Sequence, residues 1–491
     1  MKSTVGSKAG KINNTEKKTG SGAAYRTEHD SIGDREVPAD AYYGVQSFRA
    51  AENFRITGLD MHPEIIRSLA YIKKAAAITN CETGALDKRV AGAIVRACDE
   101  LLGGMFLDDF IVDPIQGGAG TSLNMNANEV IANRAIEILG GVKGDYSLVH
   151  PNDHVNMSQS TNDVIPTAGK MTAYTLLIEL KKQLQRLLEE LIKKSEEFNH
   201  IIKVGRTQMQ DAVPIRLGQE FEAYADAVMR DVRRIDRAFD EVRQVNLGGT
   251  AIGTGVNAGT DYINRIVDVL NEISGRDFIQ AAGLIESTQN AEPFAAVSGA
   301  VKACAISLSK IASDLRLLSS GPRAGFGEIS LPAKQNGSSI MPGKVNPVIP
   351  EVVNQVAFNV IGNDLTITMA AEAGQLELNA FEPIIFYNLF QSIDTLRYAV
   401  ETFVDNCVSG ITANEDRCGE LLENSISVVT ALAPAVGYQK AADIAKSALA
   451  ENISVREAAL KDGALSEEEL SMLLDPEAMT RPSYAGDKDR K

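Results

Sequence analysis

The chain has 491 residues, of which 44% are hydrophobic, and a formal net charge of −16 at pH 7. This length and apolar content are enough for a large core and more than one domain, whereas the acidic balance argues against nucleic acid or an acidic membrane surface as a partner. No apolar run reaches the roughly 18 residues that a membrane-spanning helix needs, so no membrane segment is expected.

The cysteine and histidine contents are low. The five cysteines are odd in number, widely spaced and without a C-x-x-C pair, which is typical of reduced, buried thiols in a cytoplasmic protein. No two of the five histidines have metal-ligand spacing on a helix, so the sequence does not predict a zinc site.

The first part of the chain is predicted to contain an extension and a helical N-terminal domain. Residues 1–27 are rich in Lys, Gly, Ser and Thr, which predicts a disordered extension. This segment has neither the apolar stretch of a secretory signal nor the arginines of a mitochondrial presequence. Residues 28–160 form the predicted N-terminal domain, with irregular packed structure over 31–54 and helix over 63–102, broken near Gly84.

Two polar loops precede helices in this region. Residues 113–126 are rich in glycine, hydroxyls and amides and lead into a helix expected over about 129–139. Such a loop ahead of a helix suits an anion or carboxylate, although a turn with an N-cap would explain this stretch equally well on its own.

The second loop, residues 151–163, leads into a helix expected over about 165–198, with Asp163 and Pro166 as its cap and first turn. Three consecutive polar side chains lie at its end: Ser160, Thr161 and Asn162. Because one cap needs only one of them, the surplus favours contact with a ligand.

The middle of the chain predicts long helices. A short polar connection at 205–214 precedes a helix over 217–244, and further helices are expected over 262–273, 288–319, 350–373 and 383–408. Together with the helix over 165–198, and leaving out the shorter one over 262–273, five helices of about 24 to 34 residues are expected. They predict an all-α fold with a long central bundle, residues 161–413, and not a Rossmann fold or a barrel. Shorter helices at 424–431, 438–451, 455–461 and 467–473 predict a small C-terminal helical domain, residues 414–491.

Residues 331–350 interrupt the helical pattern. Four prolines and two glycines exclude continuous helix, while Ile340, Met341 and Val345 are too apolar for a disordered segment. An ordered loop of about 20 residues inside a helical chain is usually functional. An ordered turn without a ligand is the alternative interpretation.

The polar residues of this loop are few: Ser338, Ser339, Lys344 and Asn346. Flexible glycines allow backbone N–H groups to converge on an anion, and Lys344 on a tight turn adds a positive charge. The loop therefore predicts a pocket for an oxyanion or carboxylate.

Residues 337–347 resemble the signature loop of the fumarase/aspartase superfamily and fill its pattern G-S-x-x-M-x-x-K-x-N at every position. The resemblance covers nearly the whole chain from about Ser31. It is closest to the aspartase branch over residues 113–122, 205–214 and 350–356. Fumarase-like members have histidine at position 208, where this chain has Gln208. An amide cannot titrate, so hydratase chemistry would lack an acid/base group, whereas ammonium needs no such proton to leave.

The resemblance implies reversible anti elimination of ammonia from L-aspartate to give fumarate, through an aci-carboxylate intermediate. Ser338 is implied to be the base that removes the β proton, activated by Lys344 and backbone N–H groups of the loop. The other implied substrate contacts are Thr121, Ser160, Thr161 and Ser339 at the β-carboxylate, Asn162 and Gln208 near the amino group, and Thr207, Lys344 and Asn346 at the α-carboxylate.

The resemblance also implies a homotetramer with a multi-helix core, in which each active site is assembled from three subunits. It implies no organic cofactor; some members respond to Mg²⁺, but no acidic cluster in this sequence identifies a metal site. Fumarase, or a lyase for another amino-dicarboxylate, is the alternative activity. A catalytically silent structural protein, as among the lens crystallins of this fold, is the alternative from another class.

Overall fold

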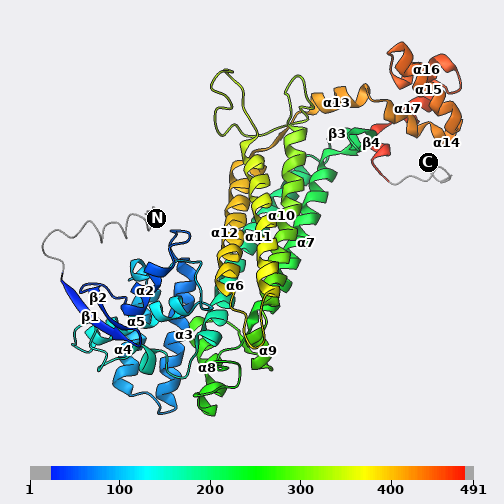
Figure 1. The fold of residues 1–491 in the computed structure, drawn as a ribbon. Coiled ribbons are helices and arrows are strands. Elements are labelled where there is room, and N and C mark those ends of the chain that lie inside the picture. Colours follow the sequence, from blue (N-terminus) through cyan, green and yellow to red (C-terminus); the bar gives the residue numbers. More distant parts are fainter. Residues whose placement is uncertain (1–23, 482–491) are drawn as a thin grey trace. The chain divides into compact units, whose positions relative to one another are not determined.

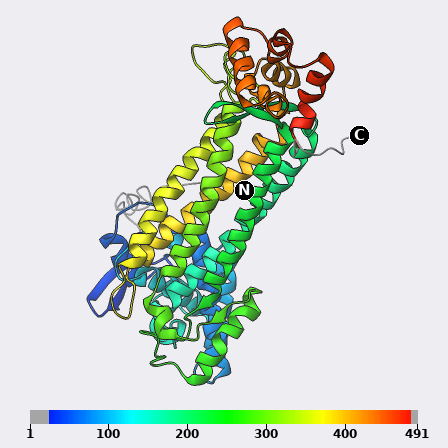
Figure 2. The same cartoon turned by 90° about the vertical axis from the view of Figure 1, so that its right-hand side faces the viewer.

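The computed structural model describes residues 24–481 (Figures 1 and 2). The chain divides into two compact units. The first comprises Met1–Lys181, Arg233–Ala303 and Phe358–Leu396, and the second comprises Lys182–Val232, Cys304–Ala357 and Arg397–Lys491. Each of the five long helices contributes residues to both units. The boundaries of the three domains predicted from the sequence stay predictions.

The first unit begins with regular structure where irregular structure was expected. Strands β1 (Tyr25–Asp30) and β2 (Gly33–Pro38) form an antiparallel hairpin, and helix α2 (Val45–Asn53) follows. Most strand residues are polar and solvent-accessible, so they lack the apolar alternation that reveals a half-buried strand. Strand β1 begins inside the predicted extension, of which residues 1–23 lie outside the described residues.

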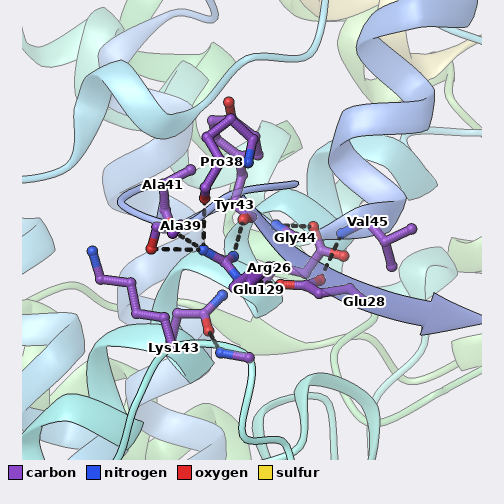
Figure 3. A network of polar contacts seen from close by, with 12 residues as sticks. Arg26, Glu28, Pro38, Ala39, Ala41, Tyr43, Gly44, Val45, Glu129 and Lys143 are labelled. Carbon is purple, nitrogen blue, oxygen red and sulfur yellow. Dashed lines mark hydrogen bonds and ion pairs between the residues drawn. The ribbon is translucent and has the colours of Figure 1, made fainter. Parts of the chain in front are cut away.

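A network of buried charges fixes this hairpin to helix α5 (Thr121–Ile138; Figure 3). The Arg26 guanidinium donates to the carbonyl oxygens of Pro38, Ala41 and Tyr43 at 2.8–2.9 Å. The carboxylate of Glu129, on α5, accepts the Gly44 N–H at 2.9 Å. Since an unpaired buried charge is costly, these bonds hold the N-terminal segment in one position on α5.

Helices α3 (Pro63–Glu82) and α4 (Lys88–Leu102) confirm the predicted break near Gly84. Helix α5 (Thr121–Ile138) begins well before the expected start near residue 129. Its first turns carry Asn124, Asn126 and Asn128, which are buried. Asparagine is uncommon inside helices, and here packing against neighbouring polar groups overrides that local preference.

Helix α6 (Thr161–Glu197) is 37 residues long and begins before the predicted position. Asp163 is therefore not its N-cap, and Pro166 lies inside the helix. The Asp163 carboxylate instead accepts backbone N–H groups from Ser160, Gly248 and Thr250. The predicted apolar stripe is buried at Leu176, Leu177, Leu180, Leu184, Leu187 and Leu191, while Leu188 is half-buried.

The predicted connection at 205–214 is a hairpin of strands β3 (Ile202–Thr207) and β4 (Gln210–Arg216). Its two turn residues, Gln208 and Met209, have φ values of 54° and 64°. Two-residue hairpin turns with positive φ normally carry Asn or Gly, and their absence explains why the sequence did not reveal the hairpin. Helix α7 (Leu217–Arg243) follows as predicted.

The remaining long helices agree with the predictions within a few residues, except that the expected helix over 288–319 is divided at Asn290. These elements are α8 (Thr260–Ser274), α9 (Leu284–Gln289), α10 (Glu292–Leu318), α11 (Val348–Glu372) and α12 (Glu382–Asn406), with short strands β5 (Gln244–Val245) and β6 (Ile279–Gln280) paired in parallel.

The all-α prediction is confirmed, because the described sheets are small two-stranded pairs and long helices pack together within each unit. In the first unit, Ser298 of α10 donates to Asp364 of α11 at 2.8 Å. In the second, Asn354 of α11 donates to the Ser309 carbonyl of α10 at 2.9 Å. Among the described helices, α10 alone is long and apolar enough, by length and composition, to cross a membrane; the core helix of a bundle passes the same test.

The end of the described chain is a group of short helices in the second unit. They pack around a small apolar core that includes Leu432, Ile444 and Leu470. The predictions for α15 (Tyr438–Glu451) and α17 (Glu467–Leu473) are confirmed. The other elements are β7 (Ile329–Ser330) paired with β8 (Thr412–Ala413), α13 (Glu415–Glu423), the 3₁₀ turn Ile426–Ala431, α14 (Ala433–Val436), α16 (Val455–Asp462) and α18 (Pro476–Met479).

Candidate active site

In the first unit, Thr121 is the first residue of α5. It follows Gly118 and Gly120, which both have a φ of 85°. The Thr121 Oγ donates to the Gly118 carbonyl at 2.8 Å, and the side chain is exposed. The positive φ values turn the chain sharply into the helix, so the Thr121 hydroxyl lies at an accessible helix N-terminus that favours negative charge.

The start of α6 presents three half-buried candidates. The Ser160 Oγ accepts the backbone N–H of Asn162 at 3.2 Å. The Asn162 side-chain amide donates to the Ala251 carbonyl at 2.7 Å. The Thr161 Oγ accepts an N–H from the Asn124 side chain at 3.2 Å. Side-chain hydrogen bonds therefore fix all three residues before any ligand binds.

Two buried charged groups lie behind the α6 start, namely Lys73 and Asp163. Burial lowers the pKa of the Lys73 ammonium to about 7, and the charge of Asp163 opposes this shift. Burial raises the pKa of Asp163 to about 6, against the effect of its three backbone N–H partners. Lys73 is not among the site residues predicted from the sequence, although its position four residues after Leu69 places it on the apolar face of α3.

In the second unit, the signature loop closes on itself. The Gly337 N–H donates to the Lys344 carbonyl at 2.8 Å, and the Asn346 side-chain amide donates to the Gly337 carbonyl at 2.8 Å. A Cβ on Gly337 would lie only 2.6 Å from the Lys344 carbonyl oxygen, so only glycine fits there. This closure defines the shape of the turn that carries Ser338 and Ser339.

The Ser338 hydroxyl oxygen accepts the backbone N–H groups of Ile340 and Met341 at 3.2 and 3.1 Å. Two such donors stabilise negative charge on Oγ and so favour the deprotonated form of the serine. Ser338 is half-buried, whereas Ser339 and Lys344 are exposed.

Thr207 and Gln208 lie exposed at the tip of the β3–β4 hairpin. An ion pair holds the hairpin next to this tip, because the Arg206 guanidinium donates to both oxygens of the fully buried Glu328 carboxylate at 2.9 Å. Glu328 immediately precedes β7 and the signature loop. The pair therefore connects the hairpin to the start of that loop within one unit.

The candidates thus fall into two groups. Thr121, Ser160, Thr161 and Asn162 belong to the first unit, and Thr207, Gln208, Ser338, Ser339, Lys344 and Asn346 belong to the second.

Comparison with known proteins identifies the family. A family model described as Lyase matches residues 33–362, and one described as Fumarase C C-terminus matches residues 428–481. The chain is 54% identical to an aspartate ammonia-lyase of a Bacillus species over 94% of this chain and 99% of the relative. The chain belongs to the aspartate ammonia-lyase family. This membership confirms the fumarase/aspartase resemblance and identifies the chain as a carbon–nitrogen lyase.

Other members and solved structures agree with this assignment. The aspartate ammonia-lyase of Escherichia coli K12 is 49% identical over 94% of this chain and 97% of the relative. A Brucella melitensis structure described as fumarate lyase:delta crystallin bound to cobalt has 52% identity and a TM-score of 0.91, covering 94% of this chain and all of that one. A class II fumarase from Schistosoma mansoni has the same TM-score and coverage at 34% identity.

Proposed function

We propose that this protein catalyses the reversible anti elimination of ammonia from L-aspartate to give fumarate. The observation that carries the proposal is the identity of 49–54% to aspartate ammonia-lyases over nearly the full length of both chains. The glutamine at position 208 supports it, since a neutral amide cannot supply the proton that a leaving hydroxide would need.

The chemistry begins with loss of a β proton. Breaking the Cβ–H bond places a second negative charge on the β-carboxylate, and stabilising this dianion is the main task of the site. In our proposal Ser338 takes the proton, because its Oγ accepts two backbone N–H groups that stabilise the alkoxide form. The protonated amino group then leaves the α-carbon as ammonia, anti to the lost proton, taking the C–N electron pair, and the electrons of the broken Cβ–H bond form the double bond of fumarate.

The uncharged donors are well suited to this task. Thr121, Ser160, Thr161 and Ser339 are assigned to the β-carboxylate, where hydrogen bonds that strengthen as charge develops favour the transition state over the bound substrate. The amino group is assigned to Asn162 and Gln208, and the α-carboxylate to Thr207, Lys344 and Asn346.

A direct assay tests the activity. Purified protein is incubated with L-aspartate, and fumarate is followed by its ultraviolet absorbance. L-malate and other amino-dicarboxylates are tested in parallel. Fumarate from aspartate, with little or none from malate, supports the proposal. Fumarate from malate alone would favour the fumarase alternative, and no turnover of any substrate would favour a silent structural protein.

We further propose a homotetramer whose active sites each draw residues from three subunits. The part of α11 in the first unit carries an exposed apolar stripe at Phe358, Ile361, Leu365 and Met369. These residues repeat at intervals of three and four, so they share one face of the helix. An uninterrupted apolar face on a long helix is the surface that helix packing between subunits buries.

Mixing two inactive variants tests the shared site. Thr161→Ala and Ser338→Ala protein, unfolded together and refolded, would form tetramers in which some sites combine a wild-type residue from each chain. Recovery of activity above that of either variant alone supports subunit sharing. If one chain supplied the whole site, every site would keep a defect and no activity would return.

The cellular location is proposed to be the cytoplasm. Cys81, Cys98, Cys407 and Cys418 are free thiols, and all of these except Cys81 are buried. Unpaired buried cysteines are typical of proteins in reducing compartments. Fractionation of the source cells, with detection of the protein in the soluble fraction, would test this assignment.

A further inference from the structure

A row of polar side chains lies behind Thr161, and the proposed chemistry does not use them. The Lys73 Nζ donates to the Asn156 Oδ1 at 2.9 Å. The Asn124 side-chain amide donates both to the Asn156 Oδ1 and to the Thr161 Oγ at 3.2 Å. Lys73 and Asn124 are only 0% and 1% exposed, so solvent cannot replace these bonds.

The partners of Asn156 fix which way its amide faces. Its Nδ2 donates to the backbone carbonyl of Gln159 at 3.3 Å, and a carbonyl can only accept. Its Oδ1 faces the Lys73 nitrogen, which donates, and also accepts an N–H from Asn128 at 3.2 Å. Both ends of the amide are therefore set by their neighbours.

This orientation is passed on to Thr161. Because the Asn156 Oδ1 can only accept, Asn124 must turn its NH₂ group toward it. The same NH₂ group then donates to the Thr161 Oγ, whose own O–H hydrogen must point away from Asn124. Thr161 is half-buried and accessible, so that hydrogen is available to an incoming ligand.

The arrangement has a cost that argues for a functional role. Within residues 24–481, the Oδ1 atoms of Asn124 and Asn128 are buried without a hydrogen-bond partner. Reversing Asn124 would place its oxygen against the oxygen of Asn156. Buried polar atoms without partners are uncommon in stable proteins, and they concentrate where another requirement outweighs stability.

We propose that Lys73, Asn156 and Asn124 are positioning residues that set the Thr161 hydroxyl as a hydrogen-bond donor toward the substrate β-carboxylate. This inference rests on the proposed function, in which Thr161 faces that carboxylate. A donor fixed in advance needs no reorientation when negative charge develops in the transition state, so it lowers the barrier to proton removal.

Two variants test this relay, the series of hydrogen bonds from Lys73 through Asn156 and Asn124 to Thr161. Asn124→Leu keeps the branching and the number of heavy atoms of the side chain and removes the donor to Thr161. Lys73→Met removes the group that holds Asn156. In each we expect kcat to fall about tenfold or more with a smaller change in KM, because the lost interaction strengthens only in the transition state. The deuterium isotope effect with L-aspartate labelled at C3 should rise, because proton removal becomes more strongly rate-limiting.

The matched control is Lys170→Met. Lys170 is also a buried lysine of the first unit, but it donates to the backbone carbonyl of Gln244 at 2.6 Å. We expect its kcat and isotope effect to stay within about twofold of the wild type, whatever its loss of stability.

Several results would overturn the relay. One is an unchanged kcat in folded Asn124→Leu protein. Another is a lower kcat with an unchanged KM and isotope effect, which would mean only that less of the protein is active. A third is an equal rise of the isotope effect in Lys170→Met. If Lys73→Met does not fold, Asn124→Leu alone decides. Wild-type protein that releases no fumarate from aspartate would instead remove the proposed function, which separates the two failures.

Discussion

The two groups of candidate residues are held in different ways. In the first unit, Asn124 holds Thr161 and Asp163 holds the neighbouring Ser160, and both supporting side chains are almost fully buried. In the second, Ser338 and Lys344 lie on a loop that is closed mainly by hydrogen bonds of its own backbone, and Lys344 is exposed. The first group is thus preorganised by a core, and the second by the geometry of one turn.

This difference teaches where each kind of substitution should act. Removing a buried polar partner leaves other groups without hydrogen bonds, so changes behind the first group should reduce stability as well as rate. Side chains on the closed loop have few packing partners, so their removal should alter rate or binding and leave folding intact.

The largest effect is expected for Ser338→Ala. Loss of the proposed base should lower kcat about 10³-fold, while the free energy of unfolding stays within about 0.5 kcal/mol of the wild type. Kinetics with L-aspartate and denaturant titration measure the two quantities. Ser330→Ala, on strand β7 just before the loop, is the control and should keep its activity. Near-normal turnover in Ser338→Ala would exclude this serine as the base.

Lys344→Ala should act mainly on binding. Removing the positive charge proposed to contact the α-carboxylate should raise KM about tenfold or more with a smaller change in kcat. Lys334→Ala, which removes another exposed lysine of the same loop, is the comparison and should change KM less than twofold. An unchanged KM in Lys344→Ala would contradict the assignment.

Asp163→Asn tests the buried side of the comparison. The Asp163 carboxylate accepts three backbone N–H groups, from Ser160, Gly248 and Thr250. Asparagine keeps one accepting oxygen, and its NH₂ group replaces either the oxygen that accepts Ser160 or the one that accepts Gly248 and Thr250. We therefore expect a loss of about 2–4 kcal/mol in the free energy of unfolding. The control is Asp240→Asn, which removes the exposed carboxylate of the Arg243–Asp240 ion pair. It should change the free energy of unfolding by less than about 0.5 kcal/mol. Equal losses in both variants would remove the contrast between the buried and exposed groups.

The long helices and the chemistry of the signature loop could be predicted from the sequence, because apolar periodicity and a specific motif carry that information. Three features could not. The turn residues Gln208 and Met209 give no hairpin signal, and Asn124 reads as loop although it lies in a helix. Lys73 falls on the apolar face of α3, which indicates burial, but its polar partner Asn156 is 83 residues away in the sequence and could not be predicted. In each case tertiary packing or strain overrides the local preference.

The buried lysine predicts a pH dependence of stability. Its pKa is lowered to about 7 in the folded protein from an ordinary value of 10.5. Between these values the unfolded chain binds a proton that the native protein has released, so stability contributed by this site rises with pH. The wild type should therefore gain about 1.4 kcal/mol per pH unit relative to Lys73→Met between pH 7.5 and 9. Denaturant titrations of both proteins at several pH values would measure the difference, and parallel curves would contradict it.

The smallest effect is expected at the exposed hairpin of the second unit. Met209 has a φ of 64°, which disfavours side chains with a Cβ, and its side chain is 57% exposed. Met209→Gly should therefore raise the free energy of unfolding by about 0.5 kcal/mol, since relief of strain exceeds the added entropy of the unfolded chain. Gln210→Gly, one residue later in strand β4, should have the opposite sign. If Met209→Gly is more stable but converts aspartate more slowly, the strained turn positions Gln208 for the reaction. If both Met209→Gly and Gln210→Gly lower the free energy of unfolding, the turn conformation is not strained.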